Sequence, residues 1–205
     1  MCEHVWDSQV EGWKPRIYIQ CIKCGKIVRD FENYVVWLTR DLDIDSVVDV
    51  GTGMKGVVAE CYYEEIRGIK RGYAVDIWKI KQLSPIWTPL NIDALRLLEY
   101  LEPKSVDVVQ AFGFLEHLEK PDGFEFLSIA EKLARKLVIV SGAKTLHGPT
   151  PDYKVKKDGN PYHLYRSTWS WRDFEPLGWE TSREHDEKGE GYGADVVAWR
   201  RLSPT

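Results

Sequence analysis

Short apolar runs and helical patterns alternate along most of the chain. Segments rich in Val and Ile predict five strands, at 46–50, 72–77, 89–92, 106–111 and 136–140. Apolar residues spaced three or four positions apart predict helices at 29–39, 54–65, 94–101 and 123–134. Continuous apolar strands between helices are typical of a mostly parallel sheet that is covered on both faces.

The last third of the chain departs from this alternation. A long polar stretch follows position 140, and Ser170–Asp173 then resembles a capping box whose helix would end at Gly178. Trp179–Glu184 and Asp195–Trp199 flank a Gly-rich turn and predict an antiparallel hairpin. We therefore expect an α/β fold with a seven-stranded, mostly parallel sheet, helices on both faces and a C-terminal antiparallel hairpin.

The composition is that of a soluble globular protein, with 205 residues of which 43% are hydrophobic and 29% charged. The net charge of −4 leaves no global electrostatic footprint for nucleic acid, although Lys154, Lys156 and Lys157 form one small basic cluster. No segment has the apolar length of a membrane span, and the N-terminus shows no signal-peptide pattern. These features lead us to expect a cytoplasmic protein.

The N-terminal segment contains a candidate metal site. Cys2 and His4 are followed by Cys21 and Cys24, so that two closely spaced ligand pairs could converge on one tetrahedral ion. Three thiolates and one imidazole with no open position favour structural zinc. A redox C-x-x-C with an unrelated histidine is the alternative. We expect a zinc-ribbon-like knuckle over residues 1–29 and a main domain over 30–205.

A glycine-rich turn follows the first predicted strand. Gly51, Gly53 and Gly56 satisfy G-x-G-x-x-G, a pattern that lets a ligand lie against bare backbone at the end of a parallel strand. The pattern by itself fits a dinucleotide. Asp49 argues against one, because a carboxylate two residues before the first glycine would repel a pyrophosphate. A nucleoside cofactor with an ammonium group and no phosphates would tolerate that acid.

Acidic residues recur at the ends of the predicted strands. Asp76 ends the second strand, Asp93 and Ala94 follow the third, and Asp107-Val108-Val109 leads to Leu115-Glu116-His117-Leu118 at the fourth. Together with the glycine turn and the closing hairpin, this order resembles the class I S-adenosylmethionine-dependent methyltransferases over roughly residues 30–202. The resemblance implies a Rossmann-like fold, S-adenosylmethionine as cofactor, and methyl transfer to an acceptor.

The resemblance also implies a role for each matching position. Asp49, Gly51, Thr52 and Gly53 would line the methionine part of the cofactor. Asp76 would accept hydrogen bonds from both ribose hydroxyls, since a carboxylate suits a cis-diol, and Ile77 would pack on the adenine. Asp93 and Ala94 would meet the adenine edge, and Ala111 and Phe112 would approach the donor methyl. The structural alternatives are a strand-end turn for Asp76 and a helix N-cap for Asp93.

The acceptor side of such a site is less defined by the sequence. A general base is needed only if the acceptor is a hydroxyl or a protonated amine. His117 is the first candidate and His163 the second, with a helix-start or packing role as the alternative for His117. Residues 141–169 should form a lid or an acceptor-pocket wall, because strand carboxyl ends face the site. An ordinary surface loop is the alternative for that stretch.

Three functions compete on this sequence. An active methyltransferase is favoured, with a small molecule as acceptor in preference to nucleic acid or protein. A non-catalytic module of the same fold would use the zinc knuckle to recognise a partner or nucleic acid. The intact Asp49, Gly51, Gly53 and Asp76 argue against that module. A nicotinamide oxidoreductase is opposed by Asp49 and by the terminal hairpin. Neither the acceptor nor the oligomeric state follows from the sequence.

Overall fold

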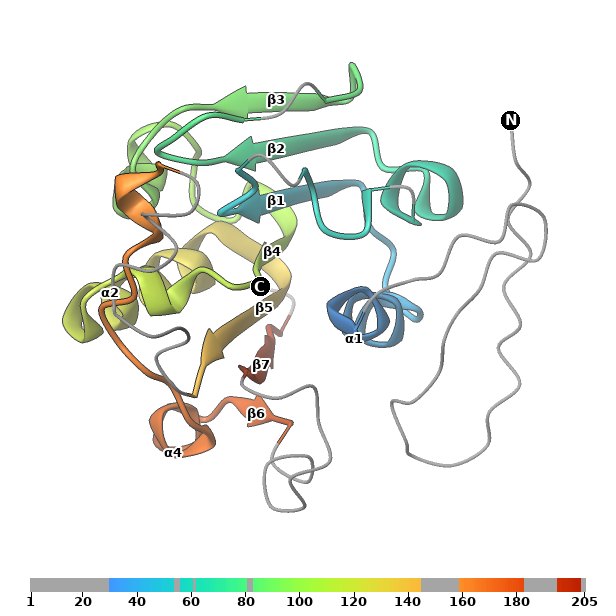
Figure 1. The fold of residues 1–205 in the computed structure, drawn as a ribbon. Coiled ribbons are helices and arrows are strands. Elements are labelled where there is room, and N and C mark those ends of the chain that lie inside the picture. Colours follow the sequence, from blue (N-terminus) through green and yellow to red (C-terminus); the bar gives the residue numbers. More distant parts are fainter. Residues whose placement is uncertain are drawn as a thin grey trace.

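The computed structural model describes residues 30–53, 56–60, 62–80, 83–144, 159–182 and 195–203. These residues form a seven-stranded sheet in the order β3-β2-β1-β4-β5-β7-β6 (Figure 1). The first five strands run parallel, and β7 is antiparallel to both of its neighbours, which confirms the predicted mixed sheet and its closing hairpin. The strands are β1 (Ser46–Val50), β2 (Arg71–Val75), β3 (Trp87–Leu90), β4 (Val106–Ala111), β5 (Ala134–Ala143), β6 (Glu180–Thr181) and β7 (Asp195–Arg201).

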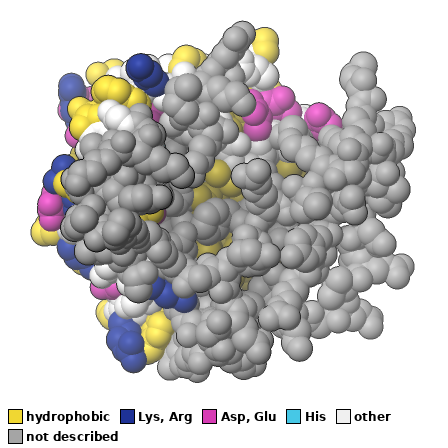
Figure 2. Space-filling model, viewed as in Figure 1, with side chains coloured by type: hydrophobic (Ala, Val, Ile, Leu, Met, Phe, Trp, Pro, Cys, Tyr) yellow, Lys and Arg dark blue, Asp and Glu magenta, His cyan; other side chains and the backbone are white. Residues whose placement is uncertain are grey.

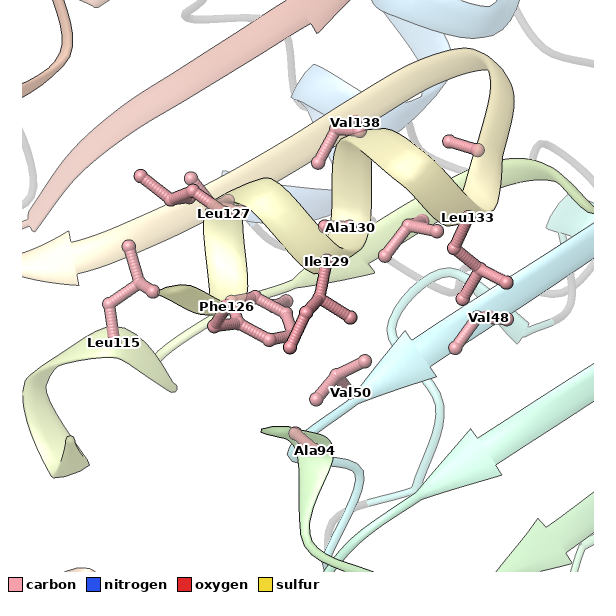
Figure 3. Packing of buried hydrophobic residues seen from close by; sticks show 14 of the residues in the cluster. Val48, Val50, Ala94, Leu115, Phe126, Leu127, Ile129, Ala130, Leu133 and Val138 are labelled. Carbon is pink, nitrogen blue, oxygen red and sulfur yellow. The ribbon is translucent and has the colours of Figure 1, made fainter. Parts of the chain in front are cut away.

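Two hydrophobic clusters occupy opposite faces of the sheet. One packs α2 (Lys120–Leu133) and the 3-10 helix η2 (Ala94–Glu99) on the sheet, and Figure 3 shows Ile129 of α2 pointing toward Val50. The other packs α1 (Asp30–Thr39) and the π-helical η1 (Tyr62–Arg67) on the second face. Neighbouring side chains of β1 fall into different clusters, because side chains alternate across a strand.

Short helices complete the described fold. They are η3 (Leu115–His117), η4 (Pro161–His163), α4 (Trp171–Phe174) and η5 (Glu175–Leu177). The predicted capping box is present at the start of α4, and Gly178 ends η5 in the left-handed region with φ 77°. Among the described residues, no helix combines the length and the apolar composition that crossing a bilayer requires.

A glycine sets the position of β3 on the sheet. The prediction placed this strand at 89–92, but the paired residues are Trp87–Leu90, with Trp87 opposite Gly72. A Cβ atom on Gly72 would lie 2.3 Å from the indole of Trp87, so only glycine accommodates this pairing. The strand therefore begins two residues earlier than predicted. The second strand shifts too, since β2 ends at Val75 and leaves Asp76 just beyond the sheet.

The helix predicted at 54–65 is present only in its last part, and the described residues 56–59 are not helical. Gly56 has φ 88° and Ala59 has φ 59°, so both are left-handed, and the regular turns begin only at Tyr62. Alanine is a good helix former and nothing local marks its conformation. Distant contacts hold this region instead: the hydroxyl of Tyr62 lies 2.9 Å from Oγ1 of Thr39, and Tyr63 donates to Gln110 at 2.8 Å.

Two further elements differ in length from the prediction. The helix expected at 94–101 is the shorter 3-10 helix η2, and α2 begins at Lys120, three residues before its predicted start. The fifth strand, predicted at 136–140, extends over Ala134–Ala143. Pairing with β7 continues to Ala143, opposite Asp195, so Ser141 and Gly142 belong to the sheet and not to the polar loop.

Candidate cofactor site

The glycine turn lies at the carboxyl end of β1, between β2 and β4. Gly51 has φ 78° and Gly53 has φ 51°, conformations that favour glycine. The backbone N–H of Gly51 donates to the carbonyl of Val75 at 2.8 Å, which ties the turn to the end of β2. A Cβ atom on Gly51 would lie 3.0 Å from the ring of Phe114, so the turn also packs closely against the segment after β4.

The side chain of Asp49 lies beneath this turn and does not face its open side. It is 1% exposed, and its carboxyl accepts hydrogen bonds from Oγ1 of Thr52 and Nε2 of Gln110, each at 2.7 Å. Gln110 also donates to the carbonyl of Val58 and accepts from Tyr63, so the network joins β1, β4 and η1. Asp49 and Thr52 are thus placed to hold the turn in shape.

Burial changes the charge of Asp49. It raises the pKa of the carboxyl from 3.8 to about 7, against the lowering effect of the hydrogen bonds from Thr52 and Gln110. A carboxyl that is partly protonated near neutral pH and covered by Thr52 repels an external pyrophosphate only weakly. Asp49 therefore disfavours a dinucleotide only weakly, and the antiparallel β7 disfavours one more strongly.

Asp76 stands at the open side of the turn. Its Oδ1 accepts from the backbone N–H of Trp78 at 2.7 Å, and its Oδ2 lies 3.4 Å from the position of a Cβ atom on Gly53. Partial burial raises the pKa of Asp76, while the N–H groups of Trp78 and Gly53 and the positive charge of His163 oppose the rise. The adjacent Ile77 is 41% exposed, an apolar surface next to a carboxylate. This pair suits a ligand with a diol and a flat ring.

Asp93 and Ala94 follow β3 at the same edge of the sheet. Oδ1 of Asp93 caps η2 by accepting from the N–H of Leu95 at 3.0 Å, so the predicted N-cap role is present. Within the described part of the chain, Oδ2 of Asp93 makes no hydrogen bond and can accept one from a ligand. Ala94 is buried under the start of η2.

The end of β4 is the floor beside the turn. Ala111 is fully buried and Phe112 is 8% exposed. After them, the backbone N–H of Gly113 donates to Oγ of Ser141 at 2.8 Å, which joins the end of β4 to β5. Ala111 therefore packs in the core, and any approach to a ligand at this point falls to Phe112 and the backbone.

The two candidate histidines meet although 46 positions separate them in the chain. The rings of His117, in η3, and His163, in η4, stack with centroids 5.4 Å apart and planes at 28°. Tyr165 lies 5.0 Å from His117 on another side, and Nδ1 of His117 is 3.3 Å from the carbonyl of Leu164. The charge of His163 also acts on Asp76. Part of the stretch predicted to be a lid thus lies near Asp76 and η3.

Hydrogen bonds hold this lid segment in place. Asn160 is buried and caps η4 by accepting from the N–H of Tyr162 at 2.9 Å. The ring of Tyr162 lies 6.0 Å from that of Trp78, just beyond β2. Further on, the N–H of Arg166 donates to the carbonyl of Glu116 at 2.8 Å. The segment therefore reaches from the residues just beyond β2 to η3.

Sequence reasoning missed several residues that shape this site. Gln110 is the clearest, since an amide inside an otherwise apolar strand is a signal that its partner is also buried. Phe114 and Trp78 carry no such signal. Their contacts with Gly51 and Tyr162 depend on how separate strands come together.

The predicted zinc ligands Cys2, His4, Cys21 and Cys24 lie outside the described residues, as does the domain boundary at 29. Among the residues that the structure describes, no group of three or more His, Cys, Asp or Glu side chains could hold a metal ion.

Comparison with known proteins bears on the fold. No protein-family model and no curated protein sequence matches this chain. An S-adenosylmethionine-dependent methyltransferase from Archaeoglobus fulgidus is similar in structure, with TM-score 0.52, 18% identity, 83% of this chain covered and 94% of that one. The methyltransferase domain of bacterial CtHen1-CN gives TM-score 0.54 and 17% identity over 84% of this chain and 97% of that one.

A third similar structure contains a ligand. Phosphoethanolamine N-methyltransferase 2 of Haemonchus contortus, solved in complex with S-adenosylmethionine, has TM-score 0.52 and 15% identity over 83% of this chain and 52% of that one. Identities this low establish the fold and not the activity. The chain therefore has the Rossmann-like α/β fold that these S-adenosylmethionine-dependent methyltransferases share.

Proposed function

We propose that this protein is an S-adenosylmethionine-dependent methyltransferase. The observation that carries the proposal is the edge formed by β1, β2 and β3, where a left-handed glycine turn, the carboxylate of Asp76 and the open oxygen of Asp93 follow consecutive neighbouring strands. These groups match, in order, a flexible amino-acid tail, a ribose diol and an adenine amine. The similar Haemonchus contortus structure was solved in complex with S-adenosylmethionine, which supports the proposal.

Each residue has a separate task in this proposal. Backbone at Gly51 and Gly53 lies against the methionine part, where a side chain would obstruct it. Asp76 accepts from the ribose hydroxyls, and the exposed Ile77 covers one face of the adenine. Asp93 accepts from the adenine amine through the oxygen that does not cap η2. Asp49 and Thr52 act indirectly, by keeping the turn in its left-handed conformation.

When bound, S-adenosylmethionine would supply an activated methyl group for transfer to a nucleophilic atom of the acceptor, with its thioether as the leaving group. The protein's part is to orient the acceptor and exclude water. In this proposal Phe112, directly after β4, and η4, whose Tyr162 contacts Trp78, would do this. Where the acceptor is a hydroxyl or an ammonium group, His117 or His163 takes its proton.

The acceptor in this proposal is a small molecule. The net charge of −4 gives no general attraction for nucleic acid, and this supports the choice. The zinc knuckle, with Cys2, His4, Cys21 and Cys24 as ligands, would then be a structural cap. The competing function is a non-catalytic module that retains the fold and recognises a partner through the knuckle.

Calorimetry separates these functions. S-adenosylmethionine and its demethylated product are titrated into the full chain and into the Asp76→Ala and Asp41→Ala variants. We expect micromolar binding to the wild type, a loss of about tenfold or more for Asp76→Ala, and no change for Asp41→Ala, whose carboxylate lies on the exposed surface. Absence of heat at high micromolar ligand would contradict an active methyltransferase. Binding of a nicotinamide dinucleotide in place of S-adenosylmethionine would favour an oxidoreductase.

A further inference from the structure

A separate pocket of about 370 Å³ lies beside α4, and its lining includes none of the predicted cofactor residues. Its walls are Lys120 at the start of α2, Lys144 after β5, and the segment Thr168–Asp173. Figure 2 shows Lys and Arg side chains next to hydrophobic ones on the surface over α4. The pocket therefore combines positive charge with aromatic surface.

Packing around Trp169 makes one wall rigid. This indole is 1% exposed, and the positions of Cβ atoms on Gly123 and Gly142 fall within 2.3 Å and 2.7 Å of its atoms. The backbone N–H of Trp169 donates to the carbonyl of Ala143 at 2.7 Å. A wall that fits between two glycines and a strand end holds its shape before any ligand arrives.

The negative charge of Asp173, the acidic residue of the pocket, is balanced by an ion pair. Asp173 accepts from the N–H of Ser170 at 2.7 Å as part of the capping box, and it forms an ion pair with Lys120 at 2.9 Å. Lys120 is in turn occupied, since it also donates to the carbonyl of Thr168 and lies 3.8 Å over the ring of Trp169. Because Asp173 and Lys120 bind each other and nearby backbone groups, we expect neither to be the main contact of a ligand in the pocket.

Arg172 is another cation of the pocket. Its guanidinium lies 4.3 Å over the ring of Trp171, and it makes no hydrogen bond or ion pair with the described residues. Stacking fixes the plane of the guanidinium and leaves its N–H fork available, which is the arrangement that recognises phosphate bidentately. Lys144 adds a second positive charge to the same pocket.

We propose that this pocket binds a phosphate group, with Arg172 as its main contact. A volume of about 370 Å³ suits a small phosphorylated molecule better than a nucleic-acid strand. The pocket also lies within reach of the end of β4, beside which the proposed methyl transfer would take place. Val140 of β5 pairs with the end of β4, and Lys144 stands four residues farther on, roughly 13 Å along the strand. If the proposed function holds, the phosphate is the anionic end of the methyl acceptor.

Phenyl phosphate is the probe for this pocket, titrated calorimetrically into the full chain without S-adenosylmethionine. We expect Arg172→Gln to weaken its binding about tenfold and Arg172→Lys, which keeps the charge but loses the fork, by a smaller factor. Arg40→Gln is the matched control, because Arg40 is an exposed arginine far along the chain, paired with Asp41, and should bind as the wild type does.

Equal binding of phenyl phosphate by the wild type and Arg172→Gln would overturn the proposal. Complete displacement of phenyl phosphate by sodium chloride, at the same ionic strength as the reference titration, would also overturn it. Tighter Arg172-dependent binding of a short single-stranded oligonucleotide would overturn the small-molecule assignment. The measurement does not involve the methyl donor. If the protein binds S-adenosylmethionine but not phenyl phosphate, the phosphate assignment of the pocket is refuted and the proposed function is unaffected.

Discussion

The side-chain amide of Gln110 donates a 2.7 Å hydrogen bond to the buried carboxyl of Asp49. This bond joins the two central strands directly beneath the glycine turn. The amide is at the same time held by the hydroxyl of Tyr63 and the carbonyl of Val58. Gln110 therefore positions an acid that the turn depends on, without itself reaching the open side of the site.

Replacement of Gln110 should lower the stability of the whole domain. Gln110→Leu leaves the Asp49 carboxyl, the Tyr63 hydroxyl and a backbone carbonyl without this partner, so we expect a loss of about 3 kcal/mol. Tyr63→Phe removes one bond of the same network and should cost about 1 kcal/mol. Urea denaturation of both variants measures these values. A Gln110→Leu variant as stable as the wild type would show that the network contributes nothing.

The raised pKa of Asp49 predicts a pH dependence of stability. Its folded value of about 7 lies above the ordinary 3.8. Between these values the folded chain binds more protons than the unfolded chain, so the contribution of Asp49 to stability falls as pH rises from about 4 to about 7. Asp49→Asn cannot ionise and loses this dependence.

The measurement for Asp49 is a pair of denaturation series at several pH values. The stability of Asp49→Asn relative to the wild type should increase with pH across the window, by about 4 kcal/mol at most. Other carboxylates titrate alike in both proteins and cancel in the difference. A difference that stays constant between pH 4 and pH 8 would contradict the raised pKa.

The packing of Trp169 predicts that replacing Gly123 by alanine destabilises the protein, although this change normally stabilises a helix. Alanine normally stabilises a helix relative to glycine by about 1 kcal/mol. In α2, however, a Cβ atom at position 123 would lie 2.3 Å from the indole of Trp169, so Gly123→Ala should destabilise the protein by about 1–3 kcal/mol. In a Trp169→Ala background, where the ring is absent, the same change should become neutral or stabilising. Additive costs in the double variant would rule out this contact as the cause.

The coupling between His163 and Asp76 can be measured without any ligand. The positive charge of His163 lowers the pKa of Asp76 against the effect of burial. His163→Gln should therefore raise that pKa further, as followed by the carboxyl carbon resonance of Asp76. Lys70→Gln serves as the control, because Lys70 is exposed and paired with Asp45. An unchanged titration in His163→Gln would mean that η4 does not lie near the cofactor edge in solution.

The predicted zinc knuckle has its own test. Replacing Cys21 and Cys24 by serine should abolish a stoichiometric zinc content of one ion per chain, because a tetrahedral site loses half of its ligands. Cys61→Ser is the matched control, since the fourth cysteine is no part of the proposed ligand set. Elemental analysis of the purified proteins gives the answer. Zinc retained by the double variant would refute the ligand assignment.

Some features of this fold were readable in the order of residues. Apolar runs marked β1, β4 and β5, because strands covered on both faces need apolar side chains at nearly every position. Glycines at 51 and 53 marked the turn, and the capping box marked α4. These signals are local, since each depends on the conformation that a few consecutive residues prefer.

The site itself was decided by contacts between distant residues. Asp49 was read as a charge facing a ligand, but Gln110, 61 positions away, holds it in the interior. Ala59 was read as helical, yet it is left-handed where the chain leads into Tyr62 and Tyr63. The stacking of His117 on His163 likewise brings together two separate segments. No local pattern records such partners, because they are chosen by how strands and helices pack.

The sequence by itself therefore determined an α/β chain with a ligand-binding turn at the end of its first strand. Only the tertiary structure decided which acids remain open to a ligand, Asp76 and Asp93, and which one is withdrawn beneath the turn, Asp49. The physical reason is desolvation: a carboxyl changes its charge and its role with burial, and burial is a property of the assembled fold.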